Sequence, residues 1–328
     1  MNPSSPAGPA PDFASAALLR VLAQGMRDLG LDPERDTPMP AGQGATVTLD
    51  EKRRLVASAL AQGGIGCLAL LGRGLHHRAG EPTHRALLAA RDVTDLFARW
   101  ARLERYIHSR PRVDLLDLAS GSARLVHLSR VGGPPPLPAE DLVVLGVLLA
   151  LLEALGAEGV VARVGDVPVY PRPGVPALAE AAQQGRTGAW LITWGAFTVG
   201  SASATGGAAA TAPDVQPPPG WPALARDGFQ TLCADLASPL SLPALARALG
   251  LAPRSLQRSL SQAGLSFAQL LAEARCRSAA GWLIKTATPV AEVGYLCGYA
   301  DQPHFTRDFR DRVGMTPLRY RSAFAVLV

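Results

Sequence analysis

The chain has 328 residues, of which 48% are hydrophobic and 18% are charged, and its formal net charge is +5. This length favours two domains. The longest apolar run, Leu142 to Leu152, is about half as long as a membrane-spanning helix requires. The four cysteines are scattered and form no disulfide framework. These features exclude a membrane-spanning protein and a disulfide-stapled one, and we expect a cytoplasmic location.

Two low-complexity segments divide the chain. Residues 1–12 are expected to form a disordered leader. They lack the charged start and the apolar run of a signal peptide. Residues 200–221 have no apolar period and contain four prolines among Gly, Ala, Ser and Thr, which is typical of a linker. The predicted domains are therefore residues 13–199 and 222–328.

The first domain begins with helical patterns. Phe13–Leu29 has helical spacing and ends at Gly30, and Asp50 is expected to cap a helix over Glu51–Gln62. The apolar run Ile65–Leu71, bounded by glycines, is consistent with a strand or with a buried helical segment.

A hairpin is predicted between two long helices. Pro82–Ser109 is expected to be one helix, and Pro138–Leu155 another. Between them, Val113–Ala119 and Ala123–Val131 flank a Ser-Gly-Ser turn, which predicts a β-hairpin.

Further strands are predicted at Val160–Val169 and Ala189–Val199. The first domain is therefore expected to be α+β, with substantial helix throughout. This content of helix excludes a sugar-binding cupin barrel. The domain also lacks the Pro-Cys-His-Arg of a DNA alkyltransferase and the acidic residues of a phosphoacceptor receiver.

Candidate ligand residues in the first domain are few. Trp190 and Trp194 would share one face of a strand and line either a ligand pocket or the core. A leucine stripe on the 138–155 helix fits either core or a dimer seam. We expect no metal, no cofactor and no enzyme activity, because no zinc-ligand spacing, nucleophile–base pair or phosphate-binding glycine loop is found. The histidines and cysteine considered as metal ligands are His76, His77, His84 and Cys67.

The second domain contains the same two-helix unit twice, in Leu242–Leu260 and Val290–Phe309, joined by a predicted helix over Ser266–Lys285. Each unit has a short apolar helix, a tight turn and a second helix with a polar outer face, which is the outline of a helix-turn-helix. Aligned positions include Ala246 with Gly294, Gly250 with Gly298, Leu256 with Phe305, and Leu260 with Phe309. An ordinary helical bundle would explain one copy, but the doubling favours an all-α DNA-binding domain.

The outer faces of the second helices carry the side chains that read base edges. Arginine and glutamine bind guanine and adenine edges bidentately, and threonine contacts the thymine methyl group. The predicted DNA-contacting residues are Arg254, Gln257 and Arg258 in the first unit, and Gln302, His304, Thr306, Arg307 and Arg310 in the second. Residues 222–328 have a net charge of +5 and residues 1–221 a net charge of zero, which matches a phosphate-binding second domain.

The stretch GYADQPHFTRDFRDRVGMTPLRYR, Gly298 to Arg321, resembles the signature of the AraC/XylS family of bacterial transcriptional regulators. The resemblance extends from about Trp221 to Ala325 and implies that both outer faces contact DNA. Two departures are Pro303, where the family usually has Ser, and Tyr299 in place of Phe. The layout of residues 13–199 is loosely similar to the arabinose-binding-like sensor domain of one subgroup, which implies effector binding and oligomerisation.

From these features we expect a one-component, effector-responsive activator of transcription. It would act as a homodimer on double-stranded DNA, together with RNA polymerase, with the two units about one helical turn (roughly 34 Å) apart. Two alternatives are an enzyme domain fused to a DNA-binding tail and a DNA-binding protein that responds to no ligand.

Overall fold

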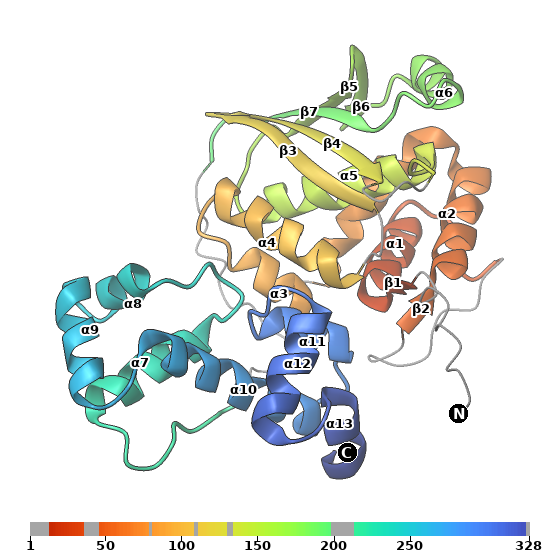
Figure 1. The fold of residues 1–328 in the computed structure, drawn as a ribbon. Coiled ribbons are helices and arrows are strands. Elements are labelled where there is room, and N and C mark those ends of the chain that lie inside the picture. Colours follow the sequence, from red (N-terminus) through yellow and green to blue (C-terminus); the bar gives the residue numbers. More distant parts are fainter. Residues whose placement is uncertain are drawn as a thin grey trace, which may run out of the picture.

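The computed structural model describes residues 13–35, 46–78, 81–107, 111–129, 134–197 and 213–325. The predicted leader and residues 200–212 of the predicted linker lie outside this part. An antiparallel sheet with helices makes up the described residues before 198, and those after 212 are helical (Figure 1). A mixed first region and an all-helical second region agree with the predicted fold class.

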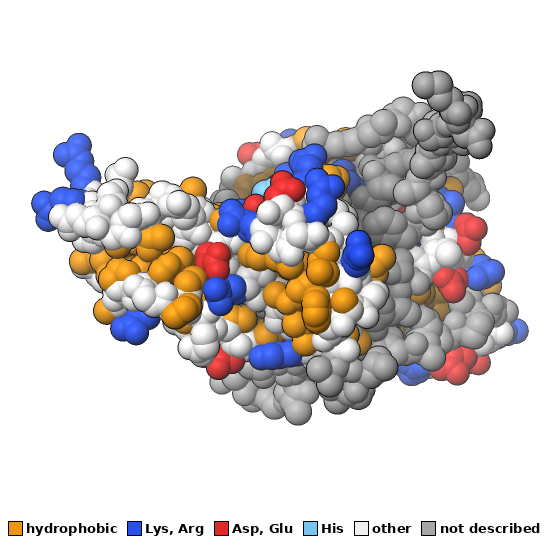
Figure 2. Space-filling model, turned by 60° about the horizontal axis from the view of Figure 1, so that its bottom comes forward, with side chains coloured by type: hydrophobic (Ala, Val, Ile, Leu, Met, Phe, Trp, Pro, Cys, Tyr) orange, Lys and Arg blue, Asp and Glu red, His pale blue; other side chains and the backbone are white. Residues whose placement is uncertain are grey.

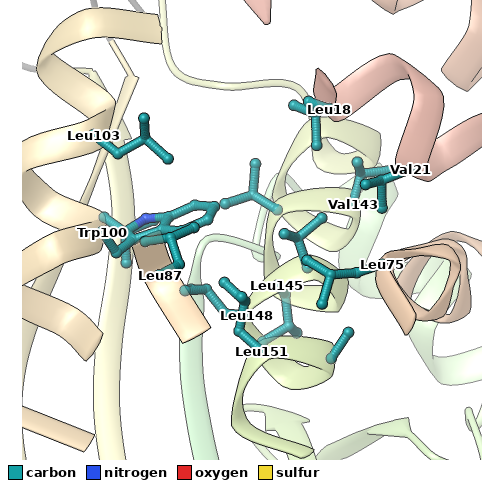
Figure 3. Close-up of a cluster of buried hydrophobic side chains, with 14 of the residues drawn as sticks. Leu18, Val21, Leu75, Leu87, Trp100, Leu103, Val143, Leu145, Leu148 and Leu151 are labelled. Carbon is teal, nitrogen blue, oxygen red and sulfur yellow. The ribbon is translucent and has the colours of Figure 1, made fainter. Parts of the chain in front are cut away.

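Helices surround a central apolar helix in the first region. Their bounds are α1 Ala16–Asp28, α2 Leu49–Gly63, the 3-10 helix η1 Ile65–His77, α3 Pro82–Leu88, α4 Val93–Ile107, α5 Pro138–Ala154 and α6 Val175–Gln183. Every residue from Leu142 to Leu152 on α5 is buried. The leucine stripe of α5 therefore lies in the core, where it meets Leu18 of α1, Leu75 of η1 and Trp100 of α4 (Figure 3).

The apolar run Ile65–Leu71, whose pattern allowed a strand or a buried helical segment, forms part of the 3-10 helix η1. Glycines let η1 pack closely between α1 and α5. A Cβ at Gly72 would lie 2.1 Å from the carbonyl carbon of Gly146 on α5, and one at Gly74 would lie 2.1 Å from the carbonyl oxygen of Val21. Side chains at these positions would separate the three helices.

The main sheet has five strands in the order β3-β4-β7-β5-β6. The strands are β3 Pro111–Ala119, β4 Ser122–Ser129, β5 Val161–Val164, β6 Val167–Tyr170 and β7 Ala189–Thr193, and a small sheet pairs β1 Phe13–Ser15 with β2 Thr46–Thr48. The predicted hairpin is confirmed, with Gly121 at φ +84° in its turn. The segment 160–169 forms a second hairpin rather than one strand, because Gly165 turns the chain at φ +55°.

The prediction of one helix over 82–109 is wrong, because the chain forms α3 and α4 with a break between them. At the break, the Asp92 carboxylate accepts a hydrogen bond from the Asp95 backbone N–H at 2.7 Å. Arg91 N donates to Asp95 Oδ2 at 3.1 Å. Asp side chains that bond the backbone in this way favour the start of a new helix over continuation.

The predicted cap of α2 is also wrong. Thr48, two residues before Asp50, caps the helix: its hydroxyl accepts from Glu51 N at 3.2 Å, and Glu51 Oε2 accepts from Thr48 N at 2.6 Å. This reciprocal capping box satisfies the backbone N–H groups of Thr48 and Glu51. Asp50 instead lies inside the first turn of the helix, which begins at Leu49. Helix α6 was not predicted.

The second region consists of seven helices within the described residues: α7 Ala223–Ala234, α8 Leu242–Ala248, α9 Pro253–Gln262, α10 Phe267–Lys285, α11 Val290–Leu296, α12 Gln302–Val313 and α13 Pro317–Phe324. Helix α10 agrees with the predicted connecting helix and is capped by Ser266. It runs between the α8–α9 pair and the α11–α12 pair (Figure 1).

The two helix pairs belong to different apolar cores. Leu256 and Leu260 of α9 pack in a separate cluster with α7, α8 and the start of α10. Phe305 and Phe309 of α12 belong instead to the large core that continues into the first region. The α11–α12 pair is therefore joined to the first region, and the α8–α9 pair stands apart from it (Figure 1).

Candidate nucleic-acid interface

The α8–α9 pair consists of two short helices joined by a tight turn. Ser241 caps α8 by accepting from Ala244 N at 3.3 Å. Gly250 ends the helix in the left-handed conformation, at φ +68°, which glycine adopts without steric cost. The buried face of α9 is formed by Leu256 and Leu260.

The opposite face of α9 is open. Arg254, Gln257 and Arg258 are all exposed. Neither arginine forms an ion pair within the described part of the chain, so both guanidinium groups retain their full hydrogen-bonding capacity. Figure 2 shows Lys and Arg side chains projecting at the outer end of the molecule, where α8 and α9 lie.

The α11–α12 pair repeats this construction. Asp301 caps α12 by accepting from His304 N at 2.8 Å, and Pro303 lies in the first turn, where its missing N–H leaves no helical bond unmade. Gly294 allows the crossing of α11 and α12, because a Cβ there would lie 2.8 Å from the Phe305 ring. A side chain at Gly294 would therefore push α12 away from α11.

Helix α12 presents arginines but a narrower polar face than α9. Arg307 and Arg310 are exposed, whereas Thr306 is half-buried. Arg310 lies 3.5 Å from Asp311, and both side chains are more than half exposed, so this contact leaves Arg310 available.

Gln302 and His304 are held against the start of α12. His304 Nδ1 accepts from Ala300 N at 3.3 Å, and its ring meets the Tyr299 ring edge-on at 5.4 Å between centroids. The Gln302 Oε1 atom is buried without a hydrogen-bond partner. Base contact by either residue remains a prediction.

A polar group behind α12 fixes the orientation of that helix. The Tyr299 hydroxyl donates to Asp308 Oδ2 at 3.1 Å, and Asp308 also accepts from Arg312 Nε at 3.0 Å. Burial raises the pKa of Tyr299 well above its usual range, so the hydroxyl stays protonated and remains a donor. Tyr299, the departure from the usual Phe, thereby adds a bond to α12.

The weak ligand candidates in the first region are buried: Trp190 is 2% exposed and Trp194 is 9% exposed. Trp190 contacts a polar network that no sequence motif marks, since its indole N–H donates to the Thr187 carbonyl oxygen and its ring lies 5.7 Å from that of His127. His127 Nδ1 lies 2.8 Å from Asp141 Oδ1, and the Thr187 hydroxyl donates to Asp141 Oδ2 at 2.6 Å. These three residues are far apart in sequence and carry no motif. Ligand binding by the tryptophans remains a prediction.

The described residues contain no cluster of side chains that could bind a metal ion. No group of three His, Cys, Asp or Glu side chains there could hold a metal ion. His84 lies 3.0 Å from the Arg78 carbonyl oxygen through Nδ1 and is buried. Burial raises the pKa of Cys276 to about 11, which disfavours its reactive thiolate. Within the same residues, no helix has both the length and the apolar character needed to cross a membrane.

The second region matches a family of known domains. The helix-turn-helix domain family matches residues 245–323, which run from within α8 through the α11–α12 pair to most of α13. The curated relatives are bacterial proteins named as regulators, two of which are described below. Residues 245–323 are therefore an AraC-type helix-turn-helix domain.

Two curated relatives illustrate the match. The chain is 40% identical over 91 residues to the ornithine utilization regulator of Pseudomonas aeruginosa, which is 27% of each chain. It is 31% identical over 94 residues to the HTH-type transcriptional regulator AdiY of Escherichia coli, which is 29% of this chain and 37% of that protein. The matches thus span 27% and 37% of the length of these relatives.

Two solved structures differ in how much of this chain they cover. A DNA-binding transcriptional dual regulator of Escherichia coli K-12 covers 33% of this chain and 96% of its own, at 25% identity and a TM-score of 0.31. The transcriptional regulator CdpR of Pseudomonas aeruginosa covers 93% of this chain at 15% identity and a TM-score of 0.34. At such TM-scores these likenesses support no statement about the first region.

Proposed function

We propose that the protein is a sequence-specific DNA-binding regulator of transcription, in which α9 and α12 enter two successive major grooves. One observation carries this proposal: equivalent positions of two like helix pairs, within an AraC-type domain, both present exposed arginines. Arg258 on α9 and Arg307 on α12 are aligned in the two copies. Unpaired arginines on exposed helices have the geometry needed to bind guanine edges or phosphates.

The first region is proposed to sense a small-molecule effector and to form a homodimer, so that the cytoplasmic protein activates transcription with RNA polymerase. Two features support a regulatory role for this region. Its size and layout are similar to a sensor domain, and its helix α4 packs directly on α11 of the DNA-binding domain. A change in the first region would therefore reach one DNA-reading pair without passing through the linker.

The proposal is tested by selection of sheared genomic DNA with the purified protein at about 150 mM salt, followed by sequencing. Salt at this level suppresses the non-specific contribution of phosphate contacts. We expect enrichment of a few promoters that share a two-part motif. Uniform recovery of fragments without a motif would reject sequence-specific regulation, and the genes beside enriched sites would identify candidate effectors.

A further inference from the structure

Polar contacts join the first region to the DNA-binding domain through α3 and α4. The Thr83 hydroxyl donates to Glu292 Oε2 at 2.7 Å, and the Arg99 guanidinium forms an ion pair with Asp235 at 2.5 Å. Arg102 donates to the carbonyl oxygen of Ala237. Figure 1 shows α11 directly against α3 and α4.

Four side chains at this interface have unmet hydrogen-bonding capacity. We call Arg102 and Tyr106 of α4, Arg275 of α10 and Tyr295 of α11 the interface cluster. Each contributes one buried atom without a hydrogen-bond partner: Nε of the two arginines and the hydroxyl oxygen of the two tyrosines. The described residues contain nine such side-chain atoms, so nearly half of them gather in one place. Buried polar atoms without a hydrogen-bond partner destabilise the fold, and their concentration in one place favours a bound partner.

The four side chains lie together. The Tyr106 and Tyr295 rings are 6.4 Å apart between centroids, and the Arg102 guanidinium carbon lies 4.8 Å from the centre of the Tyr295 ring. Tyr106 and Arg275 each lie close to a glycine, Gly294 in α11 and Gly298 just after it. A Cβ at Gly294 would lie 2.8 Å from Tyr106 Cε1, and a Cβ at Gly298 would lie 3.5 Å from Arg275 Nε.

The cluster carries positive charge without a counter-ion. No carboxylate of the described chain lies within ion-pair distance of Arg102 or Arg275. The nearby carboxylates are engaged elsewhere, since Asp235 pairs with Arg99 and Asp308 pairs with Arg312. Both arginine side chains are half-buried, and their guanidinium groups lie over tyrosine rings, Arg102 over Tyr295 and Arg275 over Tyr299, rather than beside a carboxylate.

We propose that the interface cluster binds one small oxyanion, a carboxylate or an inorganic oxyanion, between the first region and the DNA-binding domain. Arg102 and Arg275 supply charge and donors from the two sides of the interface, and the Tyr106 and Tyr295 hydroxyls complete the donor set. An oxyanion suits this arrangement because it offers several acceptor lone pairs and no donor. The site stands independently of DNA binding.

Protonation at the cluster favours an anion. Burial raises the pKa of Tyr295 to about 12 and that of Tyr106 further, so both hydroxyls remain neutral donors at ordinary pH. Burial also lowers the pKa of Arg102 and of Arg275, as expected for cations that lack a counter-ion. A bound anion would relieve this penalty on both arginines at once.

The test is thermal unfolding of the full chain while potassium acetate or potassium sulfate replaces potassium chloride at constant ionic strength. We expect a saturable rise in Tm, on the order of 5 °C at about 100 times the dissociation constant. Sulfate also stabilises proteins generally by exclusion from their surface, but that effect does not saturate. A response to acetate alone identifies a carboxylate ligand, and a response to sulfate alone identifies an inorganic oxyanion.

Variants distinguish the site from a general salt effect. Tyr295→Phe removes only one hydroxyl oxygen and Arg275→Gln removes one charge, and both should abolish most of the saturable rise. Arg277→Gln, on the same helix but paired with Glu273, should keep it. The proposal is overturned if neither salt gives a saturable rise, or if Tyr295→Phe and Arg275→Gln respond as the wild type does. Tyr295→Phe keeps the test decisive if Arg275→Gln does not fold.

Discussion

Arg258 and Arg307 are the residues on which the DNA-binding account depends most directly. Both are exposed, both lie on the polar face of the second helix of a pair, and they align between the two copies. Arg258→Ala and Arg307→Ala are each expected to weaken binding to a specific site by about 1–3 kcal/mol, because a guanidinium that contacts a base edge is lost. Titration of labelled operator DNA measures the loss.

The matched control is Arg124→Ala. Arg124 is exposed on β4 of the first region, far from either helix pair in the fold, and its removal changes the net charge equally. Wild-type affinity in Arg258→Ala and Arg307→Ala would show that these two faces do not read DNA. An equal loss in Arg124→Ala would show that net charge alone matters.

Glu104 is a buried carboxyl whose ionisation is linked to stability. It accepts from Val113 N through both oxygens, at 3.0 and 3.2 Å, but burial dominates and raises its pKa from 4.5 to about 7. Since the folded-state pKa is the higher one, the stabilising contribution is full below about pH 4.5 and is lost as pH rises through about 7.

Glu104→Gln is therefore expected to gain stability over the wild type between pH 5 and pH 8, on the order of 2 kcal/mol. Urea unfolding at the two pH values measures the difference. Glu180→Gln, which changes an exposed carboxylate on α6, should show no such trend. A parallel pH dependence in wild type and Glu104→Gln would exclude a raised pKa at this site.

At the scale of elements, two glycines at equivalent helix ends distinguish the cost of a left-handed backbone from the cost of steric overlap. Gly250 has φ +68°, and no atom lies within 4 Å of the point that a Cβ would occupy there. A Cβ at Gly298, φ +75°, would instead lie 2.2 Å from the Leu236 carbonyl oxygen. Gly250→Ala is expected to cost about 1–2 kcal/mol, the left-handed penalty alone. Gly298→Ala should cost more, about 3 kcal/mol or above, because backbone must also move.

Urea unfolding of the two variants measures the difference. Equal losses would mean that the approach of Leu236 to Gly298 is not a tight one, and the account of that crossing would fail.

Elements with local signals were predictable from the sequence. The turn at Gly121, the connecting helix α10 and both helix pairs follow from periodicity and from glycines that mark turns or helix ends. The break between α3 and α4 was missed because apolar spacing continues across it, and only the Asp92 and Asp95 side chains interrupt the backbone. The exposed arginines of α9 and α12 were likewise predictable, since helical spacing alone places them opposite the buried leucines and phenylalanines.

Contacts between distant segments were not predictable. The interface cluster joins α4, α10 and α11, and no spacing rule relates Tyr106 to Tyr295. The same holds for the buried Oε1 atom of Gln302 and for the hydrogen bond at His304, which depend on how α12 packs.

At the scale of the whole molecule, Asp235 connects the two regions. It pairs with Arg99, whose side chain is 1% exposed, while its own is 37% exposed. Asp235→Asn is expected to destabilise the fold by about 1–3 kcal/mol, because Arg99 loses one of its two carboxylate partners. Asp227→Asn on α7, an exposed carboxylate, should have little effect. Equal unfolding midpoints for the two variants would show that this ion pair does not couple the regions.

The central claim is that one chain places two reading helices in successive major grooves. Hydroxyl-radical and methylation footprinting on an enriched promoter site tests it most directly. We expect two protected segments whose centres are about one helical turn, roughly 34 Å, apart on one face of the DNA. In Arg258→Ala one segment should weaken, and in Arg307→Ala the other. A single protected segment that both variants weaken equally would contradict the claim.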